Sequence, residues 1–591
     1  MSVLGELKRR RVFQVAIAYA VVAWMMAQVV DVVNEPLNLP GWFDTAIIVT
    51  LAVGFPIAIV LAWIFDVTPQ GVVRTGSRDE ARARAGGDEQ SAADATIASP
   101  QTPVATELRC ETLPNSVAVL PLDNLSPNPD DAYFSAGIHE EIITRLAKIK
   151  DLNVIARTSV MQYAGAARPI AEIAAELRVG AIMEGSVRYA GDKVRVTGQL
   201  IDANDGTHLW TEVYDRNLAD IFAIQTDIAT CIADALKAEL APSERESIDR
   251  IPTSSQEAYA LYLRAMAELQ ERGLEIGAAR EARAGAIANL DQAIALDPDF
   301  ALAYVQRSRI NILSLNLDLG TVEDYATRRD KVEAAAIEDL ERALSLDPNI
   351  GLAHATFGRV HQYNWRGAEA RDAYNRALEL SPNDPEVLVD AAVFFAFTGN
   401  IDEGIRLGRR GLELDPNSGP RYAMNGLLYQ MSGDFDRCAE EGYRGAELAP
   451  RIVIPRIWLG QIERLRGNPD AALKNVHKAE SLLKNLTTIA LYAELVYLYG
   501  MLGHRDDAKR ILRTIREFSK TRRIPIAAWV LTNLGLGDYD RALEWLTVAA
   551  DDPQPYEGYY ATMSIVTNYL HHPVLEEPRF KEVRERMGYR D

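Results

Sequence analysis

Cysteine is scarce in this chain. Only Cys110, Cys231 and Cys438 occur in 591 residues, and they are far apart and odd in number. This excludes a disulfide framework and any zinc site built from cysteines. We interpret the three as ordinary packing or surface residues.

Long runs of lysine or arginine are also missing after residue 11, and the net charge is −20. Because phosphate backbones are bound by clustered cations, we expect no nucleic acid as a partner. The chain is too long for one ordinary core, and 48% of its residues are apolar. We therefore expect several folded domains.

The short motifs that mark common active sites are absent as well. The sequence contains no G-x-x-x-x-G-K-[ST] phosphate loop, no H-E-x-x-H zinc motif and no G-x-S-x-G nucleophile turn. We therefore expect no enzyme, no cofactor and no bound metal ion.

Two long apolar runs lie near the N-terminus, at residues 12–33 and 45–65. About 20 helical residues span the hydrocarbon core of a bilayer, so both runs are long enough to cross it. The second run holds no charged residue. The first contains Gln14, Gln28 and Asp31, which leaves an interfacial or tilted helix as an alternative. The sequence predicts a transmembrane helical hairpin as a membrane anchor within residues 1–75.

Positive charge flanks both runs but is absent between them. Basic residues occupy positions 8–11 before the first run and positions 74, 78, 82 and 84 after the second, whereas residues 34–44 hold no lysine or arginine. Because positively charged flanks stay on the cytoplasmic side, we expect two spans with the soluble domains in the cytoplasm. If only one run spans, the soluble domains lie in the periplasm. A flexible linker is expected at residues 76–114.

Residues 115–245 alternate between strand-like and helix-like patterns. Apolar runs at 116–122 and 152–157 predict strands, and three β-rich segments within 181–216 meet at turn-forming Gly-Asp and Asp-Gly pairs. Apolar residues at helical spacing follow residues 131, 169 and 219. This order predicts a small α/β domain.

Five segments of this region resemble, in this order, the TolB-amino-terminal-like domain also seen in the FlgO family of flagellar assembly. They are SVAVLPLDNLS, YFSAGIHEEIITRLA, VIARTS, EGSVRYAGDKVRVTGQLIDA and HLWTEVYDR. The opening ELKRRRVFQVAIAYAVVAW is similar to the anchor of bacterial membrane proteins that join this domain to helical repeats. The resemblance implies a location in the bacterial inner membrane. Some such proteins carry a winged-helix or nucleotide cyclase domain ahead of the anchor. Only about eleven residues precede it here, so we expect neither.

Four polar residues gather near one expected strand-to-helix turn: Asp123, His139, Glu140 and Glu141. Neighbouring carboxylates can perform acid–base chemistry when burial shifts their pKa values. Acidic residues in the first turns of a helix also stabilise its dipole without any catalytic role, and we favour this interpretation.

A phrase recurs in the second half of the chain. ALSLDPN, ALELSPN and GLELDPN end at Asn349, Asn383 and Asn417, and prolines 348, 382, 416 and 450 are each 34 residues apart. This interval is typical of tetratricopeptide (TPR) repeats, in which each repeat is a pair of antiparallel helices. Small residues let the helices approach closely, an aromatic residue fills the space between pairs, and proline ends the second helix. We assign these structural roles to Gly358, Ala370, Tyr374, Ala377, Pro382, Gly399, Pro416, Gly426, Tyr429, Pro450, Gly460 and Ala472.

The pattern predicts about eight helix pairs over residues 256–556, with a slip of two residues before 489. A capping helix is expected within 557–591. Gly404, Gly408 and Gly411 replace alanines in one repeat, and we expect each to weaken its helix by about 1 kcal/mol. The predicted fold is therefore a transmembrane hairpin, a small α/β domain and an all-α TPR superhelix.

TPR arrays bind extended peptides or partner helices on their concave face, so we expect a protein partner. The alternative is an array that packs only against its own α/β domain. Candidates for lining a groove for an acidic ligand are Arg406, Arg409, Arg410, Arg437 and Arg444. Solvated outer faces are the alternative that we favour for these arginines. The lysine and asparagine clamp of chaperone-type repeats has no match at the corresponding positions.

These observations predict a non-enzymatic scaffold that is anchored in a lipid bilayer and binds a protein through its repeats. The alternative is a signalling sensor, in which the α/β domain binds a nucleotide or another small ligand and repositions the array. This hypothesis is based on the fact that ligands often bind at the ends of strands in α/β domains.

The predicted topology can be tested with reporters fused after residue 75 or residue 591. Alkaline phosphatase is active only outside the cytoplasm, so we expect it to be inactive at both positions. Phosphatase activity at both positions would contradict the two-span topology.

Overall fold

A computed structural model describes part of the chain. The described residues are 65–68, 71–74, 112–126, 132–165, 168–190, 193–217, 220–272, 279–317, 325–364, 366–483, 489–551 and 573–586. The first apolar run, nearly all of the second and Cys110 lie outside them. None of the helices in these ranges is both long enough and apolar enough to cross a bilayer.

The chain divides into two compact units, residues 1–107 and 108–591. In the first unit, β1 (Phe65–Thr68) and β2 (Gly71–Arg74) pair as an antiparallel hairpin. The second unit contains the sheet and the helical pairs described below.

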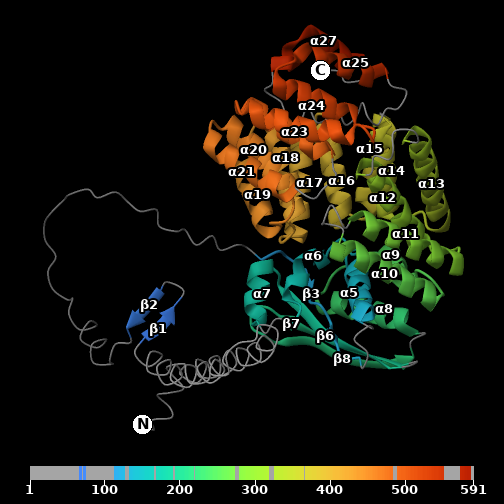
Figure 1. The fold of residues 1–591 in the computed structure, drawn as a ribbon. Helices are drawn as coiled ribbons and strands as arrows, with labels where there is room; N and C mark the ends of the chain where they lie inside the picture. Colours follow the sequence, from blue (N-terminus) through green and yellow to red (C-terminus); the bar gives the residue numbers. More distant parts are fainter. Residues whose placement is uncertain are drawn as a thin grey trace, which may run out of the picture. The chain divides into compact units, whose positions relative to one another are not determined.

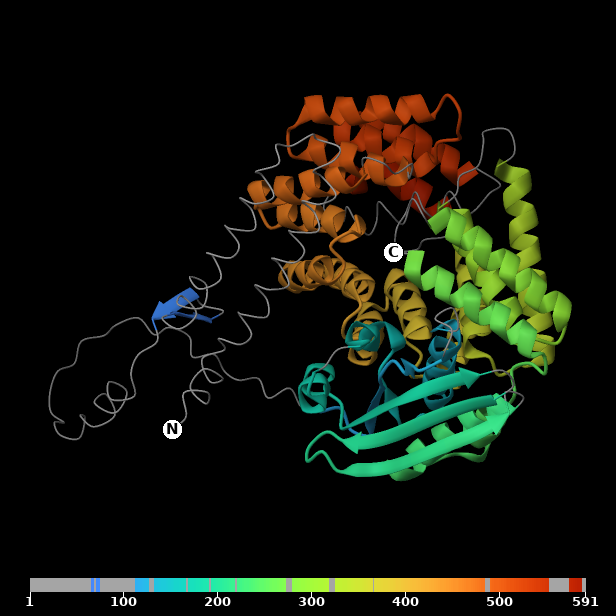
Figure 2. The ribbon, with the colours of Figure 1, turned by 60° about the horizontal axis from the view of Figure 1, so that its bottom comes forward.

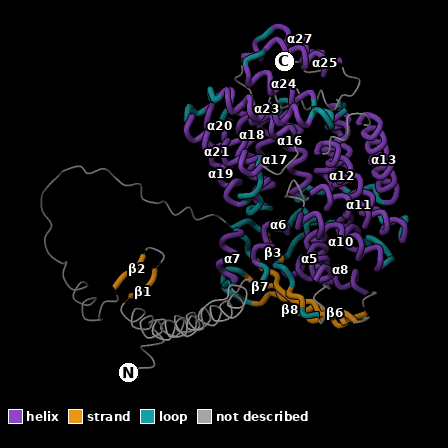
Figure 3. The backbone as a smooth tube through the Cα atoms, in the orientation of Figure 1, coloured by secondary structure: helices purple, strands orange, loops and turns teal. Residues whose placement is uncertain are grey.

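The second unit begins with a mixed sheet in the order β5-β3-β6-β7-β8, and β4 also pairs with β6 (Figure 3). Its strands are β3 (Ser116–Val119), β4 (Asp123–Asn124), β5 (Asn153–Val154), β6 (Ala181–Ala190), β7 (Lys193–Asp202) and β8 (His208–Asn217). β3 runs parallel to β5 and β6, whereas β6, β7 and β8 form an antiparallel meander. The helices of this region are α5 (Ala132–Leu146), α6 (Arg157–Val160), α7 (Ile170–Leu177), α8 (Ile221–Ala235) and α9 (Pro242–Asp249).

One face of the sheet is buried and the other is exposed. Along β7, Val194, Val196 and Leu200 are buried, while Lys193 and Arg195 between them are exposed. This period of two is typical of a sheet that is covered on one side. Helices α5 and α8 lie on the covered side (Figure 2). The predicted small α/β region is confirmed.

Paired helices make up the rest of the second unit, and the predicted all-helical TPR-like array is confirmed (Figure 1). The pairs are α10 (Gln256–Arg272) with α11 (Ala279–Leu296), α12 (Ala301–Leu317) with α13 (Tyr325–Leu346), α14 (Gly351–Tyr363) with α15 (Gly367–Leu380), α16 (Pro385–Phe397) with α17 (Ile401–Leu414), α18 (Gly419–Ser432) with α19 (Phe435–Leu448), α20 (Ile454–Leu465) with α21 (Pro469–Leu483), α22 (Ile489–Met501) with α23 (Arg505–Phe518), and α24 (Ile526–Leu536) with α25 (Tyr539–Asp551). Helix α27 (Pro578–Arg586) packs against α25.

Glycines in the left-handed conformation form the turns within many of these pairs. Gly399, Gly433, Gly467, Gly503 and Gly537 have φ values from +79° to +94°. Other residues adopt this conformation only at a cost in free energy, so glycine is the natural residue for such turns. Three of the four steps between these positions are 34 residues, and the step from Gly467 to Gly503 is 36. The wider step coincides with the predicted slip of two residues.

The first helices of successive pairs contact one another from α12 to α22 and form an inner layer, with the second helices outside them. Figure 2 shows the pairs following one another along a curve, from green through yellow and orange to red. Side chains on the inner layer therefore come from α12, α14, α16 and α18, which are neighbours in space although they are distant in sequence.

The structure places several of the predicted seam residues between the helices of the pairs, whereas Gly399 instead lies in the turn between α16 and α17, with no atom within 4 Å of its Cβ position. Ala370, Tyr374, Ala377 and Ala472 are almost completely buried. A Cβ atom on Gly358 would lie 2.9 Å from the ring of Tyr374.

Three further seam positions behave in the same way. A Cβ atom would lie 3.3 Å from the Cys438 carbonyl oxygen at Gly426, and 2.8 Å from the Val476 side chain at Gly460. Tyr429 is buried. Pro382, Pro416 and Pro450 each follow the end of a second helix by two residues.

The α/β region and the first helix pair share one hydrophobic core. The ring of Phe222 on α8 meets the ring of Tyr259 on α10 edge-on, with the ring centroids 4.8 Å apart. Gly137 of α5 lies so close to Leu263 of α10 that a Cβ atom would sit 2.0 Å from the leucine side chain. The α/β region therefore covers the N-terminal end of the array, which repeat arrays need because their terminal repeats lack a neighbour.

The three glycines of α17 are not equivalent. A Cβ atom on Gly404 would lie 2.8 Å from the carbonyl oxygen of Ala392, and one on Gly408 would lie 2.6 Å from the Asn425 and Leu428 side chains. At Gly411 the nearest atom is the Val389 side chain at 3.8 Å, which is ordinary van der Waals contact. Of the three glycines, only Gly411 has room for a Cβ atom, so it weakens the helix without being required for close packing.

We predict that Gly411→Ala raises the free energy of unfolding by about 0.5–1 kcal/mol, because alanine restricts the unfolded chain and favours the helix. Urea unfolding followed by circular dichroism measures this change. Gly404→Ala is the matched control and should lower stability. Stabilisation of both variants, or of neither, would show that the two sites do not differ in packing.

Candidate functional site

The loop that leaves the third helix pair docks on the α/β region. Asn383, which is 4% exposed, directs its side-chain amide at the backbone carbonyls of Ile149, Lys150 and Leu152, at N–O distances of 3.4, 3.1 and 3.1 Å. These carbonyls belong to the segment between α5 and β5, and the Ile149 carbonyl also accepts the N–H of Leu152 at 3.2 Å. The asparagine therefore supplies a donor from the array to backbone acceptors of the α/β region.

Arg410 of α17 fixes the orientation of this amide. Its guanidinium donates a hydrogen bond to Asn383 Oδ1 at 2.8 Å, and another to Asn153 Oδ1 of β5. Because the amide oxygen faces the arginine, the amide nitrogen must face the carbonyls. Arg410 thus touches both the loop and the sheet.

The next exit loop makes a second contact. Ser159 of α6 is fully buried, and its hydroxyl donates to Asp415 Oδ1 at 2.6 Å. The backbone N–H of Asn417 donates to Ser159 Oγ at 2.9 Å, and the N–H of Ala156 donates to the Leu414 carbonyl at 2.7 Å. Consecutive repeats therefore hold neighbouring parts of one domain.

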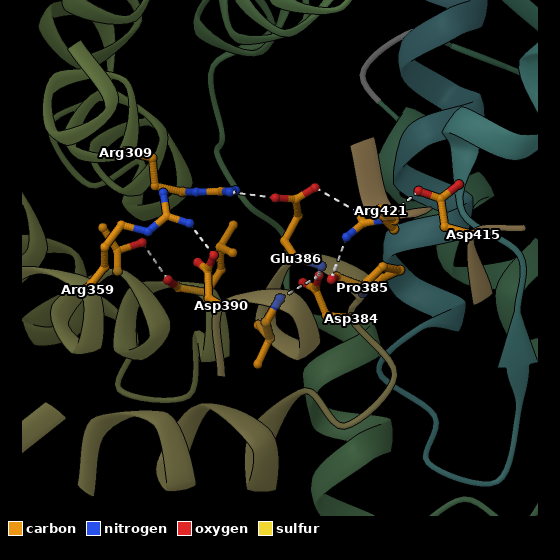
Figure 4. A network of polar contacts seen from close by, with 11 residues as sticks. Arg309, Arg359, Asp384, Pro385, Glu386, Asp390, Asp415 and Arg421 are labelled. Atoms are coloured by element: carbon orange, nitrogen blue, oxygen red, sulfur yellow. Dashed lines mark hydrogen bonds and ion pairs between the residues drawn. The ribbon is translucent and has the colours of Figure 1, made fainter. Parts of the chain in front are cut away.

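Asp415 connects this interface to an ion network on the inner layer (Figure 4). Its other oxygen accepts a 2.5 Å hydrogen bond from Nε of Arg421 on α18. Arg421 also donates to the Pro385 carbonyl at 2.7 Å and to Glu386 Oε1 at 2.8 Å. Arg309 of α12 donates to the other oxygen of Glu386 at 2.9 Å. One carboxylate thus joins helices from three different pairs.

Glu386 is the accessible member of the network. Half of its side chain is exposed, compared with 19% for Arg309 and 10% for Arg421. Burial disfavours its charge, but the guanidinium groups of Arg421 and Arg309 outweigh burial and lower the pKa of Glu386 to about 2. The carboxylate is therefore ionised at neutral pH, with a free side open to solvent.

A second ion pair lies next to this network. Arg359 of α14 bonds to Asp390 of α16, one turn along the helix from Glu386. At the start of α16, Asp384 caps the helix by accepting hydrogen bonds from the N–H groups of Glu386 and Val387. The inner face of α12–α18 therefore presents alternating arginines and carboxylates, an arrangement suited to hydrogen bonding with a polypeptide.

The arginines that sequence reasoning selected do not converge. Arg406 and Arg410 lie on α17, and Arg437 and Arg444 lie on α19, all on second helices of pairs. Each pairs with a carboxylate three residues away on the chain, and Arg409 is exposed. Only Arg410 joins the interface described above. That these arginines line a binding groove stays a prediction.

The polar residues of the α/β region have structural partners. Glu140 and Glu141 are not in the first turns of α5, because the helix begins at Ala132, so our helix-dipole interpretation was wrong. Glu141 instead pairs with the fully buried Arg145 at 3.0 Å, and Glu140 pairs with Arg157 at 3.3 Å. Asp123 is exposed on β4.

His139 is the most deeply buried member of this set. Its Nε2 lies 2.8 Å from the Val119 carbonyl, and burial lowers the pKa of His139 to about 4. The imidazole is therefore neutral at pH 7 and donates from Nε2. Within the described ranges, no group of three or more His, Cys, Asp or Glu side chains is placed to hold a metal ion.

Sequence reasoning missed Asn383, Asn417, Arg309, Glu386 and Arg421. The two asparagines follow the repeat prolines, and this position is the only signal that the sequence offers for them. Asn349 has the same signal but is exposed. The network residues are spread over 112 positions of the chain, so only the fold brings them together.

Comparison with known proteins gives one curated relative. The chain is 40% identical over 196 residues to "Putative adenylate cyclase 3" of Rhizobium meliloti (strain 1021). The match covers 33% of this chain and 32% of that protein, so the chain spans about a third of the curated relative's length. Our prediction that the chain is not an enzyme is contradicted by this match. No family model matches the chain.

Several solved structures resemble parts of the array. YrrB, described as a TPR protein with an unusual peptide-binding site, is 16% identical with a TM-score of 0.25, over 37% of this chain and 97% of that one. A tetratricopeptide repeat protein from Parabacteroides merdae is 17% identical with a TM-score of 0.31, over 47% and 99% of the two chains. Likenesses this partial do not establish a common fold, and the assignment of the array comes from its own helix pairs.

We predict that Asn383→Ala lowers the free energy of unfolding by about 1–3 kcal/mol, because it leaves buried carbonyls without donors. Urea unfolding of the full chain measures the loss. Asn349→Ala, at the equivalent position of the preceding repeat, is the matched control and should have no measurable effect. Equal effects of the two substitutions would contradict the docking role of Asn383.

The low pKa of Glu386 predicts a pH-dependent stability difference between the wild-type chain and Glu386→Gln. A carboxyl whose folded pKa lies below its unfolded value, about 4.3, stabilises the folded state above that value. The stabilisation is lost as the pH falls from about 4 towards 2. We expect the urea midpoints of the two proteins to differ at pH 7 and to approach each other near pH 2. A difference that does not change over this range would contradict the ion network.

Proposed function

We propose that the chain is a scaffold that binds a protein partner along the inner face of its helical array. The observation that carries this proposal is the half-exposed Glu386, held between two mostly buried arginines. Its free side can accept hydrogen bonds from a bound polypeptide, while Arg359 and Arg309 offer donors one and two repeats away. Polar groups held in a fixed geometry bind with little loss of conformational entropy.

The α/β region contributes to this function by holding the array. Its contacts with Asn383, Arg410 and Asp415 lie directly beside the helices that carry the network. A repeat array is otherwise joined only through neighbouring repeats, so its curvature can change. Docking of the exit loops supports an array whose inner face is preorganised at α16–α18.

We further propose that the scaffold is anchored in the inner membrane by residues 12–33 and 45–65, with its soluble part in the cytoplasm. The support is the length and apolar composition of the two runs and the basic residues that flank them. The TolB-amino-terminal-like resemblance of residues 115–245 supports the same arrangement.

Site-specific photocrosslinking tests the binding face. A photoreactive residue at Val393, two turns after Glu386 on the same face of α16, should crosslink a protein partner in cells. The same residue at Arg376, exposed on the second helix α15, is the matched control and should not. Arg309→Ala should weaken the adduct at Val393. Equal crosslinking from both positions, or no effect of Arg309→Ala, would contradict the proposal.

The curated relative favours a second candidate function, in nucleotide signalling. A protein named as a putative adenylate cyclase shares 40% of its residues with this chain over 196 positions. In this candidate the α/β region binds a nucleotide or performs cyclase chemistry, and the array transmits the change. Purified full chain with ATP and magnesium ions should then form cyclic AMP, or ATP should raise its melting temperature. If saturating ATP produces no cyclic AMP and does not raise the melting temperature, this candidate is excluded.

A further inference from the structure

Positive charge is concentrated in one short segment of this acidic chain. Residues 505–523, which contain α23, hold eight lysines and arginines but only three acidic residues. The segment is therefore strongly cationic in a chain whose net charge is −20. Charge that departs this far from the chain average calls for a local explanation.

Helix α23 separates its apolar and basic residues cleanly. Ala508, Ile511, Leu512 and Ile515 are buried in the array. The opposite face is basic and exposed, and it carries Lys509, Arg513 and Arg516, with the exposed Lys520 in the turn that follows the helix. These four follow one another at steps of four, three and four residues, so they form one stripe along the helix.

Helix α21 extends this stripe sideways. Arg510 of α23 forms hydrogen bonds to both oxygens of Glu480 on α21, at 2.7 and 3.0 Å, so the two second helices lie side by side (Figure 1). Lys474 and Lys478 are exposed on α21. We call these exposed cations of α21, of α23 and of the turn after α23 the basic face: Lys474, Lys478, Lys509, Arg513, Arg516 and Lys520.

Most of this charge is not neutralised within the protein. Lys520 pairs with Glu517 at 2.6 Å. Lys509, Arg513 and Arg516 form no ion pair with any other residue in the described ranges, and neither do Lys474 and Lys478. Glu480 and Asp507 are already bound by Arg510. The basic face thus retains its positive potential for an external anion.

We propose that the basic face binds the anionic headgroups of a lipid bilayer. It lies on outer helices, and its cations are spread over two helices rather than gathered into a pocket. The aromatic side chains of α21 and α23 are His477 and Phe518, and Phe518 is half-buried with Arg522 over its ring. Single-stranded nucleic acid is usually bound by stacking successive bases on several aromatic rings. A cation near a negatively charged leaflet gains about 1 kcal/mol, so six cations add up to substantial attraction.

The proposal rests on the proposed membrane anchor, which would bring a bilayer within reach of the array. An anchor holds the chain at the membrane but leaves the orientation of the array open. Contact through the basic face would fix that orientation and leave the inner layer, on the other side of the pairs, free for a protein partner.

The test uses the full chain in lipid nanodiscs. One set contains phosphatidylcholine alone, and the other contains phosphatidylcholine with phosphatidylserine. Lysine acylation followed by mass spectrometry reports the exposure of each lysine. The acylation rates of Lys474, Lys478 and Lys509 should fall severalfold in anionic discs only, and high salt should restore them. Lys193, exposed on β7, is the internal control and should not change.

The variant Arg513→Glu/Arg516→Glu should remove most of this protection. Each reversal should weaken the lipid-dependent contact by about fivefold or more, which corresponds to about 1 kcal/mol per cation. Lys331→Glu, which reverses an exposed charge on α13, should keep the protection. Equal acylation rates in the two kinds of disc would overturn the proposal. It would also be overturned if RNA added to neutral discs protected these lysines from acylation as strongly as anionic discs do. Failure of the anchor is distinguishable, because the chain would then not copurify with the neutral discs.

Discussion

The structure of this chain depends on how backbone carbonyl groups after α5 find hydrogen-bond donors. Backbone acceptors in a buried loop must be satisfied by water, by a side chain or by another part of the chain. Here the donor is Asn383, from a loop more than two hundred residues away, and Arg410 holds its amide in the required orientation. This contact ties the sheet to the middle of the array. Because the α/β region also shares its core with α10, it holds the array at two separate places.

Two attachments constrain the array more strongly than one. A stack of helix pairs can bend at each junction, and glycine-rich helices such as α17 resist bending poorly. The exit loops before α16 and α18 are fixed by Asn383, Asp415 and their partners, so these two first helices keep their spacing. That spacing allows Glu386 to receive Arg309 from one side and Arg421 from the other. The interface and the inner-face network are therefore parts of one polar arrangement, linked through Asp415.

Much of the array could be predicted from the sequence, because its signals are local. The proline interval, the seam residues such as Ala370 and Tyr374, and the slip before residue 489 follow from helix geometry alone. The docking residues could not be predicted, since Asn349 and Asn383 occupy the same place in the repeat and differ only in what lies opposite. The interpretation that Glu140 stabilises the helix dipole was wrong, because α5 begins at Ala132 and Glu140 therefore lies beyond its first turns. The prediction of no enzyme rested on missing motifs, and a relative with a cyclase name contradicts it.

The central claim is that the α/β region and the middle of the array unfold together, as one cooperative unit. Native-state hydrogen exchange of the full chain in low concentrations of urea measures this directly, since it reports the free energy at which each amide becomes exposed. The amide of Ala156, bonded to the Leu414 carbonyl, lies at the interface itself. The account predicts that this amide and those of α16 and α17 exchange at the same free energy with the same dependence on urea. Earlier exchange of Ala156, with the array still protected, would contradict it.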